Sequence, residues 1–255
     1  MENDLRITTR GAVTILEVTR GPANYFDHSL LKQIADAAER LEAGTECRAL
    51  VLCSEGRHFC AGANFGSGEL SDNRDEASSR LYHEGIRLFR VELPIVAAVQ
   101  GSAVGGGMGL ACAADFRVAS DATRFHPNFS ALGFHHGFGL SATLPRIVGH
   151  QKALDLLLTS RRLTGSEAAG IGLVDRQVEP GEERAGAIAL AEEVASMAPL
   201  AVRSIKQTLR AGLADEASAA LERELHEQQW LWKTRDSQIG IEANLRREHP
   251  TFIGE

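Results

Sequence analysis

The chain has 255 residues, 27 basic against 34 acidic side chains, a formal net charge of −7 and 44% hydrophobic residues. This length fits one large α/β domain or two small ones, and the ordinary apolar and charged fractions exclude a disordered chain. The acidic balance disfavours a nucleic-acid partner, because proteins that bind the phosphate backbone generally present excess positive charge.

The first half of the chain alternates apolar, β-branched runs with helical spacing. Strands are predicted at residues 12–18, 48–53, 95–100 and 116–119. A helix is predicted over 30–41, a polar segment with a weak apolar face over 72–92, and a short helix at 110–114 after the Gly-rich residues 101–109. The strand at 95–100 is too apolar to be half-exposed, so we expect it to be central in a sheet covered on both faces.

Helices dominate the second half, after an irregular segment at 125–139. They are predicted at residues 150–161, 166–170, 182–197, 200–211 and 215–233, with one strand at 173–178. This order indicates an α/β core over residues 1–195 and a helical C-terminal region, 196–255, of the same functional unit. Its apolar residues exceed the needs of a free tail, so we expect it to pack on the same core or on another subunit.

Cysteine spacing and the N-terminus bear on the compartment. Cys47, Cys53, Cys60 and Cys112 form no C-x-x-C pair, which predicts buried free thiols and no metal site. The first residues lack the apolar stretch of a signal peptide, and the nearly uncharged run 93–114 is interrupted by glycines and a proline. We therefore expect a cytoplasmic protein without a membrane span.

Three segments pass from a strand into a Gly-rich loop, at residues 50–64, 95–108 and 132–139. None has the spacing of a dinucleotide-binding motif, a P-loop or a G-x-S-x-G elbow. The triple glycine at 105–107 precedes an apolar helix, whose first amides are unpaired donors able to hold a negative oxygen. The same glycines also suit close packing of a helix on a strand, and spacing alone leaves both interpretations open.

Four motifs resemble the crotonase superfamily, the enoyl-CoA hydratase/isomerase family: FCAGAN at 59–64, PIVAAVQG at 94–101, AVGGG at 103–107 and ADFRVAS at 114–120. The resemblance extends over essentially the whole chain. It implies an α/β fold, a crotonase-like spiral of ββα turns with a helical C-terminal trimerisation region. It also implies a homotrimer or a dimer of trimers that acts on an acyl-CoA thioester, with coenzyme A as part of the substrate and no other cofactor.

The resemblance further implies where the thioester is held. The backbone N–H groups of Ala63 and Gly106 would form an oxyanion hole, and the carbonyl of Ala61 would lie near the adenine. The positions that would bind coenzyme A are Arg57, Ala61, Gly62 and Gly105. Arg57 and the adjacent His58 would meet its phosphates, although a solvated turn is an equally good interpretation of this pair.

The sequence departs from the family at the two glutamates that its hydratases use. The first position is Gly109, and ungapped matching puts the second at Phe129, or at Asn128 or Ser130 if the register slips. Adding water to a double bond needs a base for the water and a proton for the α-carbon. Ordinary hydration is therefore not expected, and isomerisation, decarboxylation or C–C cleavage of a CoA thioester is.

Histidines remain near the expected pocket, and neutral imidazole can move protons near pH 7. His136 and His135 are the preferred catalytic residues, because His136 falls where related naphthoate synthases place a catalytic aspartate. His126 is a further candidate, and a loop histidine bonded only to backbone is the alternative for each. Other residues that could reach the acyl group from the segment over the pocket are Tyr82, His83 and Glu84.

Two other functions stay open: a non-catalytic acyl-CoA-binding protein and a scaffold subunit without affinity for coenzyme A. A carboxylate such as Glu69 or Glu84 that turns into the pocket would restore hydratase or isomerase chemistry. Several aromatic residues could line the pocket and favour a bulky or cyclic acyl group, unless they belong to the core: Tyr25, Phe26, Phe65, Phe129, Phe134 and Phe138.

Overall fold

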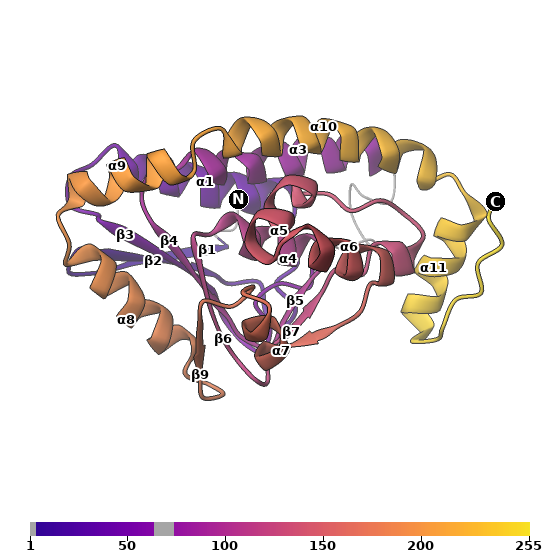
Figure 1. Cartoon of the computed structure of the whole chain (residues 1–255), viewed down its shortest axis with the longest axis horizontal. Coiled ribbons are helices and arrows are strands. Elements are labelled where there is room, and N and C mark those ends of the chain that lie inside the picture. The colour runs from indigo at the N-terminus through magenta and orange to yellow at the C-terminus, as the bar shows by residue number, and fades with distance from the viewer. Residues whose placement is uncertain (1–3, 64–73) are drawn as a thin grey trace.

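The computed structural model describes residues 4–63 and 74–255 and has an α/β fold (Figure 1). Its larger sheet has the strand order β1-β2-β3-β4-β6-β9, in which β1 is antiparallel to β2 and the other neighbours are parallel. The strands are β1 (Leu5–Arg10), β2 (Val13–Val18), β3 (Ala49–Ser54), β4 (Ile95–Val99), β6 (Phe116–Ser120) and β9 (Arg176–Val178). All five residues of β4 are buried between β3 and β6, which confirms the central strand expected there.

A smaller sheet and a set of helices complete the described part of the chain. The smaller sheet has the order β5-β7-β8, with β5 (Ser102–Val104), β7 (Arg124–His126) and β8 (Leu163–Thr164). The helices are α1 (His28–Glu42), α3 (Arg74–Arg87), α4 (Gly106–Ala113), α5 (Leu140–Val148), α6 (His150–Thr159), α7 (Gly165–Gly170), α8 (Glu183–Ala195), α9 (Pro199–Leu209), α10 (Leu213–Leu231) and α11 (Arg235–Arg246). Single 3-10 turns lie at Leu88–Arg90 and Ser130–Leu132.

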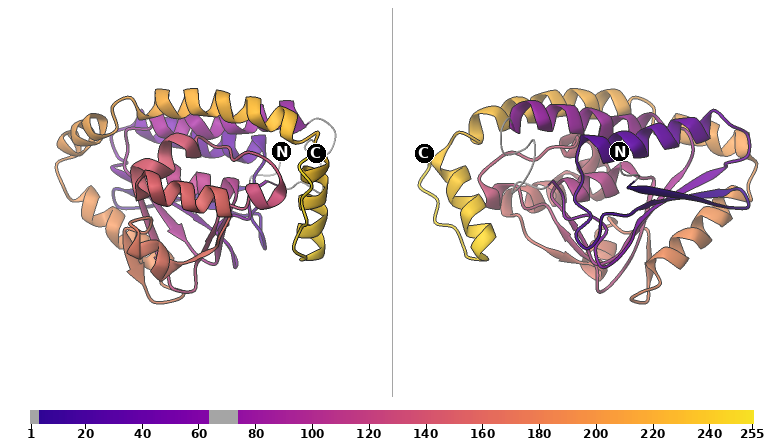
Figure 2. Two further views of the ribbon diagram at one scale, coloured as in Figure 1. Left: turned by 45° about the vertical axis from the view of Figure 1, so that its right-hand side comes forward. Right: turned by 180° about the vertical axis from the view of Figure 1, so that it is seen from behind.

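Alternation along the strands divides the core between the two faces of the larger sheet. Ala49 and Val51 of β3 face α8, where they pack with Leu190 in one apolar cluster. Leu50 and Leu52, the alternate residues, belong to the larger cluster on the opposite face, with α1. Figures 1 and 2 show α8 on one side of the sheet and α1, α3 and α10 on the other.

Several elements differ from the sequence predictions. α4 begins at Gly106 rather than at residue 110, because glycines that usually weaken a helix are needed here for close packing. The segment expected to be irregular after residue 125 contains the end of β7, and α5, with an internal Pro145, was not predicted. The strand expected at 173–178 is confined to Arg176–Val178. The short or half-exposed strands β1, β5 and β8 were also missed, whereas α11 falls in the C-terminal region that was predicted to be helical, although its bounds were not predicted.

The C-terminal helices pack largely on their own core. α10 lies along α3 and α5 and buries Leu221, Leu225 and, just after its end, Trp232 (Figure 1). α9 has no fully buried residue, and its Leu200 and Leu209 are 81% and 77% exposed. In the part of the chain that the structure describes, only the bent pair α8 and α9 has the length and apolar composition of a membrane span, and no single helix does.

All four cysteines are buried and unpaired, as the sequence predicts. Burial raises the pKa of Cys53 and Cys112 to about 11 and that of Cys60 to about 12. These thiols are therefore protonated at neutral pH and contribute as small apolar side chains.

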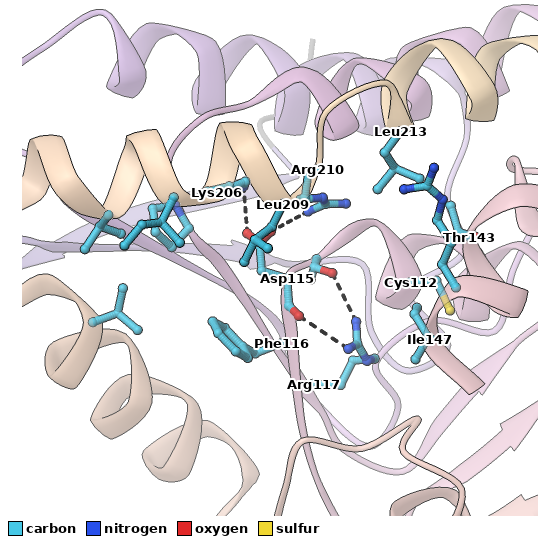
Figure 3. Close-up of a pocket in the computed structure, with 16 residues that line it drawn as sticks. Cys112, Asp115, Phe116, Arg117, Thr143, Ile147, Lys206, Leu209, Arg210 and Leu213 are labelled. Carbon is cyan, nitrogen blue, oxygen red and sulfur yellow. Dashed lines mark hydrogen bonds and ion pairs between the residues drawn. The ribbon is translucent and has the colours of Figure 1, made fainter. Parts of the chain in front are cut away.

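A cluster of ionised side chains joins α9 to the corner between α4 and β6 (Figure 3). Asp115 accepts hydrogen bonds from the Ile95 backbone N–H (2.8 Å), Lys206 Nζ (2.6 Å) and Arg210 Nη1 (2.5 Å). All three charged side chains are mostly buried. They border a cavity of about 430 Å³, and most of its other described lining residues are apolar. Because Lys206 and Arg210 both bind Asp115, we assign these three charged side chains to stabilising the fold at this corner.

We predict that Asp115→Asn lowers the free energy of unfolding by about 3 kcal/mol, because it leaves two buried cations without their counter-charge. Urea denaturation followed by circular dichroism measures this loss. Asp121→Asn makes the same chemical change at an exposed carboxylate and is expected to cost less than about 0.5 kcal/mol. Equal stability of the two variants would contradict the assignment.

Candidate active site

Two Gly-containing segments lie side by side at the end of the smaller sheet. Cys60 N donates to the Ser102 carbonyl, and Val104 N donates to the Cys60 carbonyl, each at 3.0 Å. Gly62 has a φ of +89°, and a Cβ atom there would lie 2.8 Å from the Val104 carbonyl oxygen and 3.7 Å from Gly106 N. The backbone after Cys60 therefore runs directly against the entry into α4.

Two further glycines allow the same approach. A Cβ atom at Gly107 would lie 2.3 Å from the Cys60 carbonyl oxygen, and one at Gly101 would lie 1.9 Å from the Arg57 carbonyl oxygen. No side chain fits at such distances, since the clashing atoms belong to the backbone and cannot turn aside. Close packing of a helix on a neighbouring segment, one of the two interpretations of the triple glycine, is therefore confirmed.

The same packing leaves two amides available. Gly106 is the first residue of α4, and the carbonyl of Gly105 accepts the amides of Met108 and Gly109. Among the hydrogen bonds of the described residues, none has Ala63 N or Gly106 N as its donor. Both residues border one cavity of about 400 Å³. Amides at a helix N-terminus carry the positive end of the helix dipole, so this wall of the cavity suits a negative oxygen.

The predicted coenzyme A-binding positions Ala61, Gly62 and Gly105 border the same cavity. Arg57 and His58 do not: they lie in an adjoining hollow of about 730 Å³, which shares Ser102 with the cavity. The ionisable side chains among the described lining of the cavity are Tyr25, Tyr82, Arg124, His126 and Arg162. This described lining contains no carboxylate.

The histidines are arranged differently from the sequence prediction. His126 borders the cavity, whereas the preferred His135 and His136 are absent from its described lining. His136 Nε2 lies 2.7 Å from Ser141 Oγ, and its ring stacks on that of His135 with centroids 4.1 Å apart. Burial lowers the pKa of His126 to about 4, with a contribution from Arg162, and burial lowers that of His136 to about 3. Both rings are therefore neutral at pH 7.

Of the three residues expected over the acyl pocket, one borders the cavity and two do not. Tyr82 borders the cavity, and burial raises its pKa. His83 lies 2.9 Å from Glu222, and Glu84 pairs with Arg87 at 2.5 Å, so neither belongs to the described lining. Glu69, the other carboxylate considered, lies outside the described residues.

The predicted aromatic lining is confirmed only in part. Tyr25, Phe129 and Phe134 border the cavity, and Phe129 contacts the ring of His136. Phe26 and Phe138 are fully buried behind its wall. Phe65 lies outside the described residues.

Glu224 of α10 is a buried carboxylate that the sequence analysis missed. Its two oxygens accept the amides of Gly139 and Ser141, each at 2.8 Å, and so cap the N-terminus of α5. His136 Nε2 lies 3.7 Å away. Burial raises the pKa of Glu224 to about 7 in spite of these hydrogen bonds. A signal was available, because Glu224 falls on the apolar stripe between Leu221 and Leu225.

Comparisons with known proteins find relatives over nearly the whole chain. A family model described as enoyl-CoA hydratase/isomerase matches residues 8–255. A probable enoyl-CoA hydratase of Bacillus subtilis is 30% identical over 99% of this chain and 100% of its own, and a putative enoyl-CoA hydratase of Thermus thermophilus is 36% identical over 90% and 92%. The crystal structure of an enoyl-CoA hydratase from Mycobacterium avium subsp. paratuberculosis superposes with a TM-score of 0.85, at 28% identity over 98% of both chains.

Glu224 gives a pH prediction. Its folded pKa of about 7 exceeds its ordinary value of 4.5, so the folded protein holds an extra proton between these pH values. The contribution of this group is fully present below pH 4.5 and is lost as the pH rises through 7. We expect the stability of the wild type, relative to Glu224→Gln, to fall by up to about 3 kcal/mol from pH 4.5 to 8.

Chemical denaturation of both proteins across this pH range measures the difference. Glu182→Gln, which alters an exposed carboxyl, serves as the control and is expected to follow the wild type. A constant difference between the wild type and Glu224→Gln at every pH would contradict a raised pKa.

Proposed function

Since the chain belongs to the enoyl-CoA hydratase/isomerase family, we propose that it is an enzyme that binds an acyl-CoA thioester and stabilises negative charge on the thioester oxygen. The observation that carries this proposal is that two amides without a partner among the described residues, those of Ala63 and Gly106, border one cavity. Each fixed donor of this kind typically lowers a barrier by about 3 kcal/mol. Charge that develops as an enolate or a tetrahedral intermediate therefore meets dipoles that need no reorganisation.

We further propose that the reaction is not hydration by paired glutamates but isomerisation, decarboxylation or C–C cleavage. By ungapped matching the positions corresponding to the two glutamates are Gly109 and Phe129, or Asn128 or Ser130 if the register slips, and none of these residues is a carboxylic acid. At Gly109 a Cβ atom would lie 2.5 Å from Cβ of Phe138, so the space for a side chain is already filled. The described lining of the cavity offers no carboxylate in their place. The favoured reactions need the oxyanion contacts but less acid–base assistance.

Two side chains of the described lining can hydrogen-bond the reacting group. His126 is neutral at pH 7 and offers an acceptor nitrogen, while the buried phenol of Tyr82 stays protonated and offers a donor; burial makes the first a weaker base and the second a weaker acid than in water, so we assign them to positioning. Arg124 and Arg162 supply positive charge to the described lining of the cavity, where they would attract a negatively charged part of the substrate. We assign His135 and His136, which lie behind Phe129, to holding the loop before α5.

The substrate brings coenzyme A with it, and we propose no further cofactor. Gly62 and Gly105 would line the pantetheine arm next to the thioester, and the carbonyl of Ala61 would lie near the adenine. Arg57 would reach the phosphates from the adjoining hollow, which joins the cavity at Ser102.

The function is tested by incubating the protein with malonyl-, β-ketoacyl- and enoyl-CoA esters and following products by mass spectrometry. We expect turnover of at least one ester, and Ala63→Pro, which lacks the amide hydrogen, to lower kcat/KM about 100-fold to 1,000-fold. Ala63→Gly keeps the amide and is expected to lose far less.

Each other outcome identifies a different function. Saturable binding of acyl-CoA without turnover of any ester would favour the non-catalytic binding protein. Absence of coenzyme A affinity in calorimetry would favour the scaffold subunit. Efficient hydration of enoyl-CoA would contradict the proposed reaction class while leaving the family assignment intact.

We also propose that the protein assembles as a trimer or a dimer of trimers through α9. Leu200, Ile205 and Leu209 of α9 are large apolar side chains that the chain itself leaves exposed, and Ile205 and Leu209, four residues apart, lie on the same face of the helix. Light scattering of the wild type is expected to give a mass three or six times 27.5 kDa, and Leu200→Glu combined with Leu209→Glu is expected to reduce it. A monomeric wild type would contradict this assembly.

A further inference from the structure

Phe138 is the centre of an aromatic cluster behind the wall of the cavity that contains Gly106 and Tyr82. Its side chain is fully buried, and its backbone has a φ of +65°, which a bulky residue adopts only at a cost. The ring centroid lies 5.9 Å from that of Phe26 and 5.8 Å from that of Tyr82. The surrounding packing must therefore stabilise this strained conformation.

Two glycines make room for the Phe138 side chain. A Cβ atom at Gly85 of α3 would lie 2.5 Å from Cζ of Phe138, and a Cβ atom at Gly109 of α4 would lie 2.5 Å from its Cβ. The phenylalanine thus fills the space between these two helices. Both α3 and α4 therefore have a glycine, which has no side chain, at their contact with Phe138.

The cluster reaches the thioester cavity through its other two members. Tyr82 borders the cavity directly. Phe26 lies under the oxyanion position, because a Cβ atom at Gly106 would be 2.4 Å from its Cζ. Phe138 backs both rings, so an acyl chain that extends past the thioester in this direction meets a packed aromatic wall.

We propose that Phe138 is a specificity-determining residue that closes the inner end of the cavity and restricts the substrate to short acyl groups. This inference rests on the proposed function, since it concerns the acyl group of the same thioester. It differs from the bulky or cyclic acyl group that aromatic composition favours, because Phe26 and Phe138 occupy the space instead of lining it.

The test uses binding, which requires no turnover. Calorimetry with saturated acyl-CoA esters from acetyl to decanoyl gives a chain-length profile for the wild type, Phe138→Ala and Phe138→Gly. We expect the wild type to bind butyryl-CoA at least tenfold more tightly than decanoyl-CoA. We expect both variants to bind decanoyl-CoA at least tenfold more tightly than the wild type, with acetyl-CoA affinity changed less than threefold.

Two controls keep the outcomes distinct. Phe138→Gly opens the same volume and relieves the positive φ, so it supplies a folded variant if Phe138→Ala is unstable. Leu190→Ala removes a buried side chain from the α8 face of the sheet and is expected to leave the profile unchanged. An unchanged profile in a folded Phe138 variant, or equal wild-type affinity for butyryl- and decanoyl-CoA, would overturn the inference. Absence of any acyl-CoA binding by the wild type would instead overturn the proposed function.

Discussion

Backbone-to-backbone contact between two segments is the constraint on which the site depends. At Gly62, Gly101 and Gly107 the neighbouring carbonyl oxygen lies within 3 Å of where a Cβ atom would be. These contacts hold the 57–63 segment against the strand and helix that follow β4, and they bring Ala63 and Gly106, whose amides have no partner among the described residues, to one cavity. A single methyl group at Gly107 would push the segments apart and separate the two donors.

The aromatic cluster and the ionic corner extend this arrangement. Glycines at positions 85 and 109 accept the ring of Phe138, so α3 and α4 approach each other through one shared side chain. At the other end of α4, Asp115 fixes the turn into β6 and also holds α9 through Lys206 (Figure 3). α4 is therefore held by Phe138 at Gly109 and by Asp115 just after its last residue.

The central strands could be predicted because their signals are local, and the resemblance predicted that Ala63 and Gly106 lie at one cavity, whereas their role as an oxyanion hole stays a prediction. β-branched runs mark the central strands, and the motifs around Ala63 and Gly106 lie within a few residues of those strands. Side-chain direction could not be predicted in the same way. His126 borders the cavity and His136 does not, because the chain turns several times between them and the turns depend on contacts with distant helices. The buried position of Glu224 could not be predicted for the same reason, since its hydrogen-bond partners lie more than 80 residues earlier in the chain.

The proposed function requires both amides to bind the thioester oxygen, and difference infrared spectroscopy of a bound acyl-CoA with a ¹³C-labelled thioester carbonyl detects these two hydrogen bonds. Two hydrogen bonds to the oxygen polarise the carbonyl and lower its stretching frequency. We predict a clear downshift on binding to the wild type, reduced when Ala63 is replaced by proline. A carbonyl band at its aqueous frequency in the saturated complex, unaffected by that replacement, would contradict the claim.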